Sequence, residues 1–267
     1  MASPVEKHLN TGAEFEDPDV ARAYGARSPY PSALHAHLQR LAPARTRMVD
    51  LGCGPGKLAL ALADAFDEVF AVDPSAAMLA AGRERDQGRH SNIRWVHASA
   101  EAFPIPTPCD LIVAGASIHW MDHAMVFPKL AAALGREGVL AIVDGDGPHD
   151  APWKADYVAM LTRWVEGMGG VFGDPAFRTR MTAHEAWIEV AGRETFAATV
   201  AQDVEDFIES EHSRATWARA KMGAELAPRF DADLRDVLTP YARLGQIEFQ
   251  SLSTVVWGRP LNHAALP

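Results

Sequence analysis

Short apolar runs alternate with amphipathic segments through the first half of the chain. Each run has the length of a strand, and the runs lie at 48–51, 68–73, 93–96, 110–114 and 139–143. Segments with helical character lie at 58–66 and 125–134, and another helix is expected to begin near Ser75. Runs that are apolar on nearly every position are typical of strands covered by helices on both faces. Because strand, helix and strand repeat at the length of βαβ units, we expect a parallel, doubly wound α/β sheet.

The pattern changes after residue 148. Bulky apolar side chains then recur at helical spacing on one face, at Trp153, Tyr157, Met160, Leu161, Trp164 and Met168. A glycine-rich break at 167–170 follows, then amphipathic helices at 203–220 and 230–244, where Pro240 kinks or ends the second. A sixth strand is expected at 195–200, and the last strand is expected to carry residues 247–251 and 254–257.

No linker divides the two halves. We therefore expect residues 1–148 to form a ligand-binding core with an N-terminal lid segment. Residues 149–267 should form a helical cap plus the last two strands of the same sheet. The cap should lie over the carboxyl edge, where such sheets bind ligands. The apolar side chains on its helices could enclose a small acceptor, or they could simply pack the cap onto the sheet.

Composition narrows the class of protein. The chain has 267 residues, enough for a substantial core, and its formal net charge of −10 argues against a nucleic-acid partner. No apolar run is long enough to span a bilayer, and residues 1–6 lack the basic and apolar regions of a signal peptide. The two cysteines, Cys53 and Cys109, fit a reducing compartment, and the histidine spacing gives no metal motif. We expect a cytoplasmic enzyme without a metal or a membrane partner.

Three glycines on alternate positions follow the first predicted strand. Gly52, Gly54 and Gly56 come directly after Asp50, and Cys53 is interpreted as a small turn residue. Such a turn lets the backbone approach a ligand closely. A dinucleotide turn has the pattern G-x-G-x-x-G and binds a pyrophosphate. A carboxylate at position 50 would repel a pyrophosphate but would attract the ammonium group of an amino-acid-like ligand. A tight strand-to-helix turn without a ligand is the alternative.

Asp73 ends the second predicted strand, 17 residues after Gly56. An acid at this place in a doubly wound sheet can accept hydrogen bonds from both ribose hydroxyls of a bound nucleoside. The alternative is that Asp73 caps the helix that begins near Ser75. Both functions are compatible with its position.

With an acid ahead of G-x-G-x-G, the chain resembles the class I S-adenosylmethionine-dependent methyltransferases, in particular the type-11 and trans-aconitate methyltransferase-like groups. The resemblance implies a Rossmann-like, mostly parallel sheet of seven strands that binds S-adenosylmethionine and releases S-adenosylhomocysteine. The sequence R-S-P-Y-P at 27–31 is similar to the R-P-x-Y-P lid of these groups, with Ser28 in place of the first proline. It implies that Arg27 pairs with the carboxylate of the cofactor's methionine part; a solvated Arg27 is the alternative.

Two later segments extend the resemblance. Residues 99–104, S-A-E-A-F-P, correspond to D-A-E-A-L-P in relatives, so Ser99 replaces the acid that accepts a bond from the adenine amino group. Residues 115–122 correspond to the segment that lies beneath the cofactor and ends in a His-Trp pair. The cofactor-binding residues implied in this way are Arg27, Asp50, Gly52, Cys53, Gly54, Gly56, Asp73, Pro74, Met78, Ser99, Ala100, Glu101 and Ala116.

His119 is the candidate catalytic residue. At the end of the fourth predicted strand it could take a proton from an acceptor, or it could only orient neighbours and pack. The function implied is methyl transfer to a small molecule on O, N or C, such as a natural product or a carboxylic acid. The alternative is a protein that uses the same site as a cyclase, a sensor or a partner subunit. His149, His184 and His212 are further candidates for the pocket.

Overall fold

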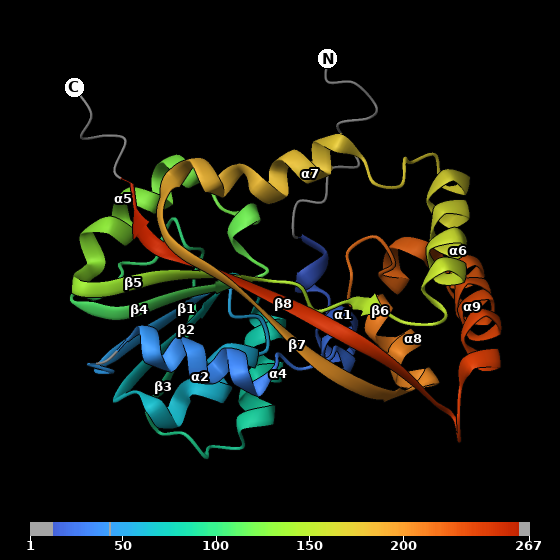
Figure 1. Ribbon diagram of the computed structural model, residues 1–267, viewed down its shortest axis with the longest axis horizontal. Coiled ribbons are helices and arrows are strands. Elements are labelled where there is room, and N and C mark those ends of the chain that lie inside the picture. Colours follow the sequence, from blue (N-terminus) through green and yellow to red (C-terminus); the bar gives the residue numbers. More distant parts are fainter. Residues whose placement is uncertain (1–12, 43, 262–267) are drawn as a thin grey trace.

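The computed structural model describes residues 13–42 and 44–261, so the expectation for residues 1–6 lies outside the described residues. Within this part of the chain, eight strands form one sheet in the order β3-β2-β1-β4-β5-β8-β6, and β7 pairs with β8 along its whole length (Figure 1). The five parallel strands are β1 (Arg47–Leu51), β2 (Glu68–Asp73), β3 (Ile93–His97), β4 (Cys109–Gly115) and β5 (Leu134–Asp144). The predicted Rossmann-like, mostly parallel sheet is confirmed.

The sheet has one strand more than the seven predicted. The additional strand, β6 (Pro148–Asp150), has three residues and pairs antiparallel with β8. The sequence analysis did not predict this strand, because three residues carry no periodic pattern from which a strand can be recognised.

Two long antiparallel strands connect the sheet with the C-terminal helices. β7 (Ile188–Asp203) pairs along its length with β8 (Gln246–Pro260), and both are longer than the runs predicted at 195–200 and 247–257. β8 also pairs with β5, whose last residue, Asp144, faces Thr254. Residues 246–253 therefore continue beyond the carboxyl edge of the parallel strands. Figure 1 shows this ribbon running from the sheet to α6, α8 and α9.

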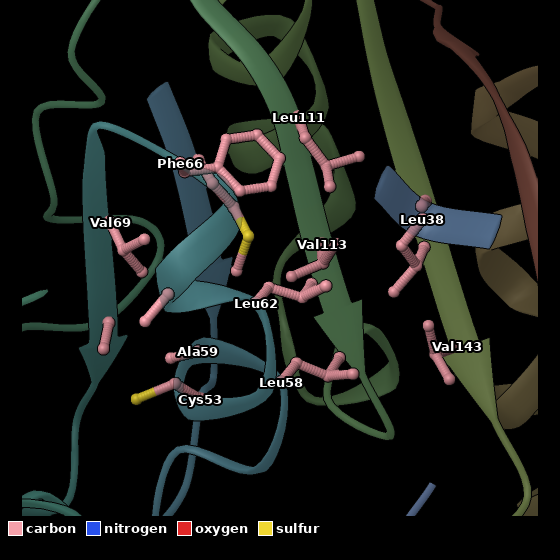
Figure 2. Close-up of a cluster of buried hydrophobic side chains, with 14 of the residues drawn as sticks. Leu38, Cys53, Leu58, Ala59, Leu62, Phe66, Val69, Leu111, Val113 and Val143 are labelled. Atoms are coloured by element: carbon pink, nitrogen blue, oxygen red, sulfur yellow. The ribbon is translucent and has the colours of Figure 1, made fainter. Parts of the chain in front are cut away.

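Helices cover both faces of the parallel strands. They are α2 (Ser32–Leu41), α3 (Lys57–Leu62), α4 (Ala76–Asp86) and α5 (His123–Ala133), while α1 (Pro18–Ala23) packs on α4. Side chains of α2 and α3 pack on one face, and those of α5 pack on the other. Figure 2 shows the first of these clusters, in which Leu38, Leu58 and Leu62 meet Leu111 and Val113 of β4. This double burial explains why the strands are apolar on nearly every position.

The cap helices are α6 (Lys154–Gly167), α8 (Val204–His212) and α9 (Arg219–Leu238). They share a core with the far end of β8, formed by aromatic side chains such as Trp153, Phe207, Phe230 and Phe249. The predicted stripe is thus buried within the cap from Trp153 to Leu161, whereas Met168 lies beyond the end of α6 and is 42% exposed.

The prediction of one helix over 203–220 is wrong. α8 ends at His212, and residues 213–218 form a connection before α9 begins. In this connection Trp217 is buried and stacks on Phe230, with ring centroids 4.8 Å apart, and its carbonyl accepts a hydrogen bond from His212. Tertiary packing of Trp217 therefore overrides the helical periodicity. α9 ends at Leu238, directly before the turn that contains Pro240, so this proline ends the helix.

A separate helix, α7 (Pro175–Thr182), follows the glycine-rich break and has no buried residues. It leads into the 3-10 turn η6 (Ala183–Trp187), and Figure 1 shows it lying across the sheet at its carboxyl edge. Among the described residues, no helix combines the length and apolar character needed to cross a membrane.

Candidate functional site

A cavity of about 400 Å³ lies at the carboxyl ends of β1, β2 and β4. Its walls are the turns that follow these strands and a short N-terminal segment that closes it from outside. The residues that line it are Ala13, Phe15, Glu16, Tyr24, Gly52, Gly54, Asp73, Pro74, Ser75, Met78, Ser99, Ala100, Glu101, Gly115, Ala116, Ser117, Trp120 and Met121. Nine of the thirteen predicted cofactor residues are in this set. The other four, which do not line the cavity, are Arg27, Asp50, Cys53 and Gly56.

The glycine turn forms the floor of the cavity. Gly52, Gly54 and Gly56 all have positive φ angles, of 66°, 53° and 78°, which other residues rarely adopt. A Cβ atom on Gly52 would lie 2.5 Å from Cβ of Ser117, and one on Gly56 would lie 2.5 Å from the ring of Trp95. A Cβ on Gly54 would meet no atom within 4 Å. Gly52 and Gly56 are therefore needed for packing, whereas Gly54 keeps the cavity open to a ligand.

Asp73 lies beside the glycine turn and is 7% exposed. Its Oδ2 accepts a hydrogen bond of 2.8 Å from the backbone N–H of Gly54, and its Oδ1 accepts one of 2.8 Å from Ser75. Burial raises the pKa of this carboxyl, and the two backbone donors oppose the rise. The hydroxyl of Ser75 caps α4 by accepting from the N–H of Met78. The cap is therefore Ser75, and Asp73 keeps free lone pairs toward the cavity.

Asp50 and Cys53 lie beside the main cavity, in a narrow cleft that shares Tyr24, Gly52 and Gly115 with it. The carboxyl of Asp50 is 1% exposed and accepts a hydrogen bond of 3.0 Å from the N–H of Ala59. Burial raises its pKa to about 7, although the bond from Ala59 favours the ionised form.

Lys57 borders the same cleft as Asp50. Its ammonium donates a hydrogen bond of 2.7 Å to the carbonyl of Ser28. Burial lowers its pKa to about 8, against the attraction of the Asp146 carboxylate 3.7 Å away. The sequence analysis assigned no function to this lysine, which is the first residue after the glycine turn.

The guanidinium of Arg27 forms hydrogen bonds with other residues of the protein. Its guanidinium donates to Ser213 Oγ at 2.6 Å, to the Ser213 carbonyl at 3.0 Å and to Asp146 Oδ2 at 3.3 Å. The Arg27 side chain is only 9% exposed, so the alternative of a solvated surface arginine is wrong, and the pairing of Arg27 with the cofactor stays a prediction. It lies 4.0 Å from the ring centroid of Tyr24, which lines the cavity. Arg27 thus holds the N-terminal segment against the cap.

The remaining predicted residues line the far end of the cavity. The Ser99 hydroxyl accepts a hydrogen bond of 3.2 Å from the N–H of Ala102, and Glu101 accepts one of 2.9 Å from Asp122. Partial burial would raise the pKa of Glu101, but the Asp122 N–H and other donors hold it below its usual range. Ala116 has φ of 51°, an uncommon angle for alanine, and its N–H donates to the carbonyl of Val143 at 2.8 Å.

The N-terminal segment contributes lining residues that the sequence analysis did not assign. Phe15 packs edge-on against Trp120 with ring centroids 5.8 Å apart, and its carbonyl accepts a hydrogen bond from the Ser75 hydroxyl at 2.7 Å. Glu16 lines the cavity from the same 3-10 turn, Ala13–Glu16. Isolated residues before the first strand carry no local pattern, so only tertiary structure places them here.

His119 belongs to the 3-10 turn η5 (Ile118–Trp120) and is not among the residues that line the cavity. Its ring centroid lies 5.0 Å from that of Trp120, which does line it. Burial lowers the pKa of His119 to about 4, and positive charge on Arg180, His184 and His123 adds to this effect. At neutral pH the imidazole is therefore uncharged, with a nitrogen lone pair that can accept a proton.

The other candidate histidines are separated. His149 is exposed, His184 lines a second cavity, and His212 is buried in the cap, where Asp231 and the Trp217 carbonyl occupy both ring nitrogens. Among the described residues, no group of His, Cys, Asp or Glu side chains is arranged to hold a metal ion.

Residues 48–138 match the model of a family described as a methyltransferase domain. A trans-aconitate 2-methyltransferase of Variovorax paradoxus is 37% identical over 131 residues, which are 48% of this chain and 49% of that protein. A probable S-adenosylmethionine-dependent methyltransferase of Saccharomyces cerevisiae is 29% identical, covering 52% of this chain and 47% of that protein. This chain thus spans about half the length of these curated relatives.

The fold is also found in a solved structure. A putative type II methyltransferase from Anaeromyxobacter dehalogenans superposes with a TM-score of 0.64 at 23% identity, and the match covers 89% of this chain and 99% of that one. The family match includes the glycine turn, Asp73 and the Ser99–Glu101 segment, and fourteen of the eighteen residues that line the cavity fall within it. Over residues 48–138 the chain is therefore similar to a methyltransferase domain, and the curated relatives that it matches are named as methyltransferases.

Proposed function

We propose that this protein transfers the methyl group of S-adenosylmethionine to a small molecule. The main observation behind this proposal is the hydrogen bond that the Gly54 N–H donates to the Asp73 carboxylate at the floor of the cavity. Asp73 has lone pairs left for two ribose hydroxyls, and Gly54 leaves room for the sugar. The named methyltransferase relatives support the same reading.

The residues on the two sides of Asp73 suit the two ends of the cofactor. Met78, Ser99 and Ala100 offer an apolar surface, a hydroxyl and a backbone N–H, which suit the adenine ring. On the other side, the narrow cleft presents Asp50 and Lys57, one carboxyl and one ammonium. This pair suits the ammonium and carboxylate of the methionine part. Lys57 thus takes the place that the resemblance assigned to Arg27.

S-adenosylmethionine supplies a methyl carbon on positive sulfur: an acceptor lone pair forms the new bond, and the electrons of the broken C–S bond stay on sulfur. Alignment and exclusion of water are then the main tasks of the protein. Phe15, Tyr24 and Trp120 close the cavity with aromatic rings. His119 would take the proton of an acceptor hydroxyl, although its pKa of about 4 makes it a weak base.

The acceptor is proposed to be a small molecule. One of the relatives is named for trans-aconitate, and Arg180 of α7 lies 4.6 Å from the ring centroid of Trp120 in the cavity wall. An alternative in which the site serves a cyclase, a sensor or a partner subunit is less well supported, because the named relatives are methyltransferases.

The remaining expectations form part of the same proposal. We assign residues 1–148 to the cofactor-binding core and 149–267 to the cap with the last strands. The formal net charge of −10 supports a protein without a nucleic-acid partner, and we place this protein in the cytoplasm as part of the proposal.

Replacing Asp73 by alanine tests the ribose contact. Asp73→Ala should weaken S-adenosylhomocysteine binding by about 1–3 kcal/mol, the range for losing hydrogen bonds to a charged acceptor. Calorimetric titration measures the change, and Asp64→Ala is the matched control, because Asp64 is an exposed carboxylate at the end of the neighbouring helix. Unchanged affinity in a folded Asp73→Ala protein would mean that Asp73 serves only the local backbone.

The pKa of Asp50 predicts a pH dependence of cofactor binding. Below about pH 7 the free protein holds Asp50 protonated, so an incoming ammonium must displace this proton. Affinity for S-adenosylhomocysteine should therefore fall by up to about tenfold per pH unit from 7 toward 5. Asp50→Asn, which cannot ionise, should bind more weakly at pH 7 and show a flatter curve. Parallel pH curves for the two proteins would exclude the contact between Asp50 and the ammonium.

If His119 is the base of the reaction, its replacement should lower turnover strongly. His119→Asn should then reduce kcat by about 10²–10⁴ while cofactor affinity stays nearly unchanged. Because the imidazole becomes protonated only near its pKa of about 4, the wild-type rate should stay level from neutral pH to about 5 and fall below that. Turnover within about threefold of wild type would show that His119 only orients its neighbours.

A further inference from the structure

Strand β7 forms one edge of the sheet (Figure 1). β8 pairs with β5 and β6 along one side and with β7 along the other, so the outer side of β7 has no partner strand among the described residues. From Arg193 to Asp203 the pairing with β8 runs without a register shift, and the irregularity lies before it, between Val190 and Gly192. The regular stretch 193–203 therefore presents a row of outward backbone N–H and C=O groups to which a further strand can bind.

The middle of this edge lacks the features that usually prevent strand pairing. Edge strands are ordinarily protected by lysine, proline, a bulge or a covering element. Residues 195–201, T-F-A-A-T-V-A, contain no charged residue, no proline and no glycine. Thr195, Ala197, Thr199 and Ala201 are exposed, and the side chains between them face the core and the cap. The edge is thus open, and its exposed side chains are small.

Opposite charges lie at the two ends of the same stretch. The Arg193 side chain is 56% exposed and pairs at 2.9 Å with Glu185, which is also exposed. Such a surface pair contributes little to stability, and one contact leaves other guanidinium donors available. Asp203 is exposed at the N-terminus of α8, and its carboxylate makes no capping hydrogen bond there. Both charges are therefore available to a partner.

An antiparallel copy of the same strand complements these charges. Pairing of two β7 strands about a two-fold axis at Ala198 places Arg193 opposite the partner's Asp203 at both ends of the contact. A shift of the register by one residue would exchange the inner and outer faces of the strand. A shift by two would place Arg193 opposite the partner's Ala201 or beyond the end of its β7. The charges thus select one register.

We propose that β7 is the interface of a symmetric dimer, in which the 193–203 stretches of two copies pair antiparallel and join their sheets into one. In this arrangement Phe196 lies opposite the partner's Val200, and such pairs of aromatic and β-branched side chains stabilise antiparallel strands. Because β7 leads directly into α8, the same contact holds the base of each cap. The proposal is independent of the reaction in the cofactor cavity.

A cysteine at the two-fold axis tests the contact itself. Opposite residues of an antiparallel pair have Cα atoms about 4.5–5.5 Å apart, a separation that a disulfide can span. Ala198→Cys should therefore cross-link two copies when air and copper phenanthroline oxidise the thiols. Ala191→Cys is the matched control, because two copies of this exposed residue would lie about 46 Å apart at about 3.3 Å per residue. The natural Cys53 and Cys109 are both buried.

Charge reversal tests the register. Sedimentation equilibrium of the wild-type chain should show a dimer that dissociates on dilution. Arg193→Asp should raise the dissociation constant by about tenfold or more, because like charges then face each other twice in each dimer. Combining Arg193→Asp with Asp203→Arg should restore the dimer. Glu185→Gln, which changes only the partner of Arg193 within the chain, should leave the dissociation constant nearly unchanged.

Circular dichroism identifies the variants that are folded, and the tests are read on these. A wild-type chain that stays monomeric at every concentration would overturn the proposal, as would absence of a cross-link through Ala198→Cys or equal cross-linking through Ala191→Cys. A dimer that Arg193→Asp leaves intact, or that the double reversal does not restore, would also overturn it.

Discussion

Three backbone N–H groups of the glycine turn are held by the end of strand β2. Those of Gly52 and Cys53 donate to the Val72 carbonyl at 2.8 and 3.0 Å, and that of Gly54 donates to the Asp73 carboxylate at 2.8 Å. A turn with three left-handed glycines has little conformational preference of its own, so these bonds determine its shape. Because Asp73 belongs to both the strand end and the cavity, the parallel pairing of β1 and β2 positions the floor of the proposed cofactor cavity.

A second constraint closes the site. The Asp146 carboxylate lies 3.3 Å from Arg27, 3.7 Å from Lys57 and 3.8 Å from Arg214, so it joins the N-terminal segment, the glycine turn and the cap. The three cations hold the pKa of Asp146 far below its usual range in spite of its burial. Removing one member of such a buried cluster leaves uncompensated charge, so the closed arrangement depends on all of them.

The parts predicted well are those with local patterns. Apolar runs gave the five parallel strands, and the spacing from Gly56 to Asp73 matched a strand end that lies beside the turn. The 203–220 segment was misread because its conformation depends on a distant partner, Phe230, on which Trp217 stacks. The partners of Arg27, Ser213 and Asp146, are also distant in the sequence, so no local pattern predicts them. Phe15 and Glu16 likewise reach the cavity only through tertiary contacts.

The central claim is that the glycine turn and Asp73 bind S-adenosylmethionine. Calorimetric titration of the wild-type protein with S-adenosylhomocysteine, and separately with NAD, tests it most directly. We expect binding of the first at one molecule per chain and no binding of NAD, and loss of binding in Gly54→Val, whose side chain would enter the cavity. Binding of NAD without binding of S-adenosylhomocysteine would contradict the account.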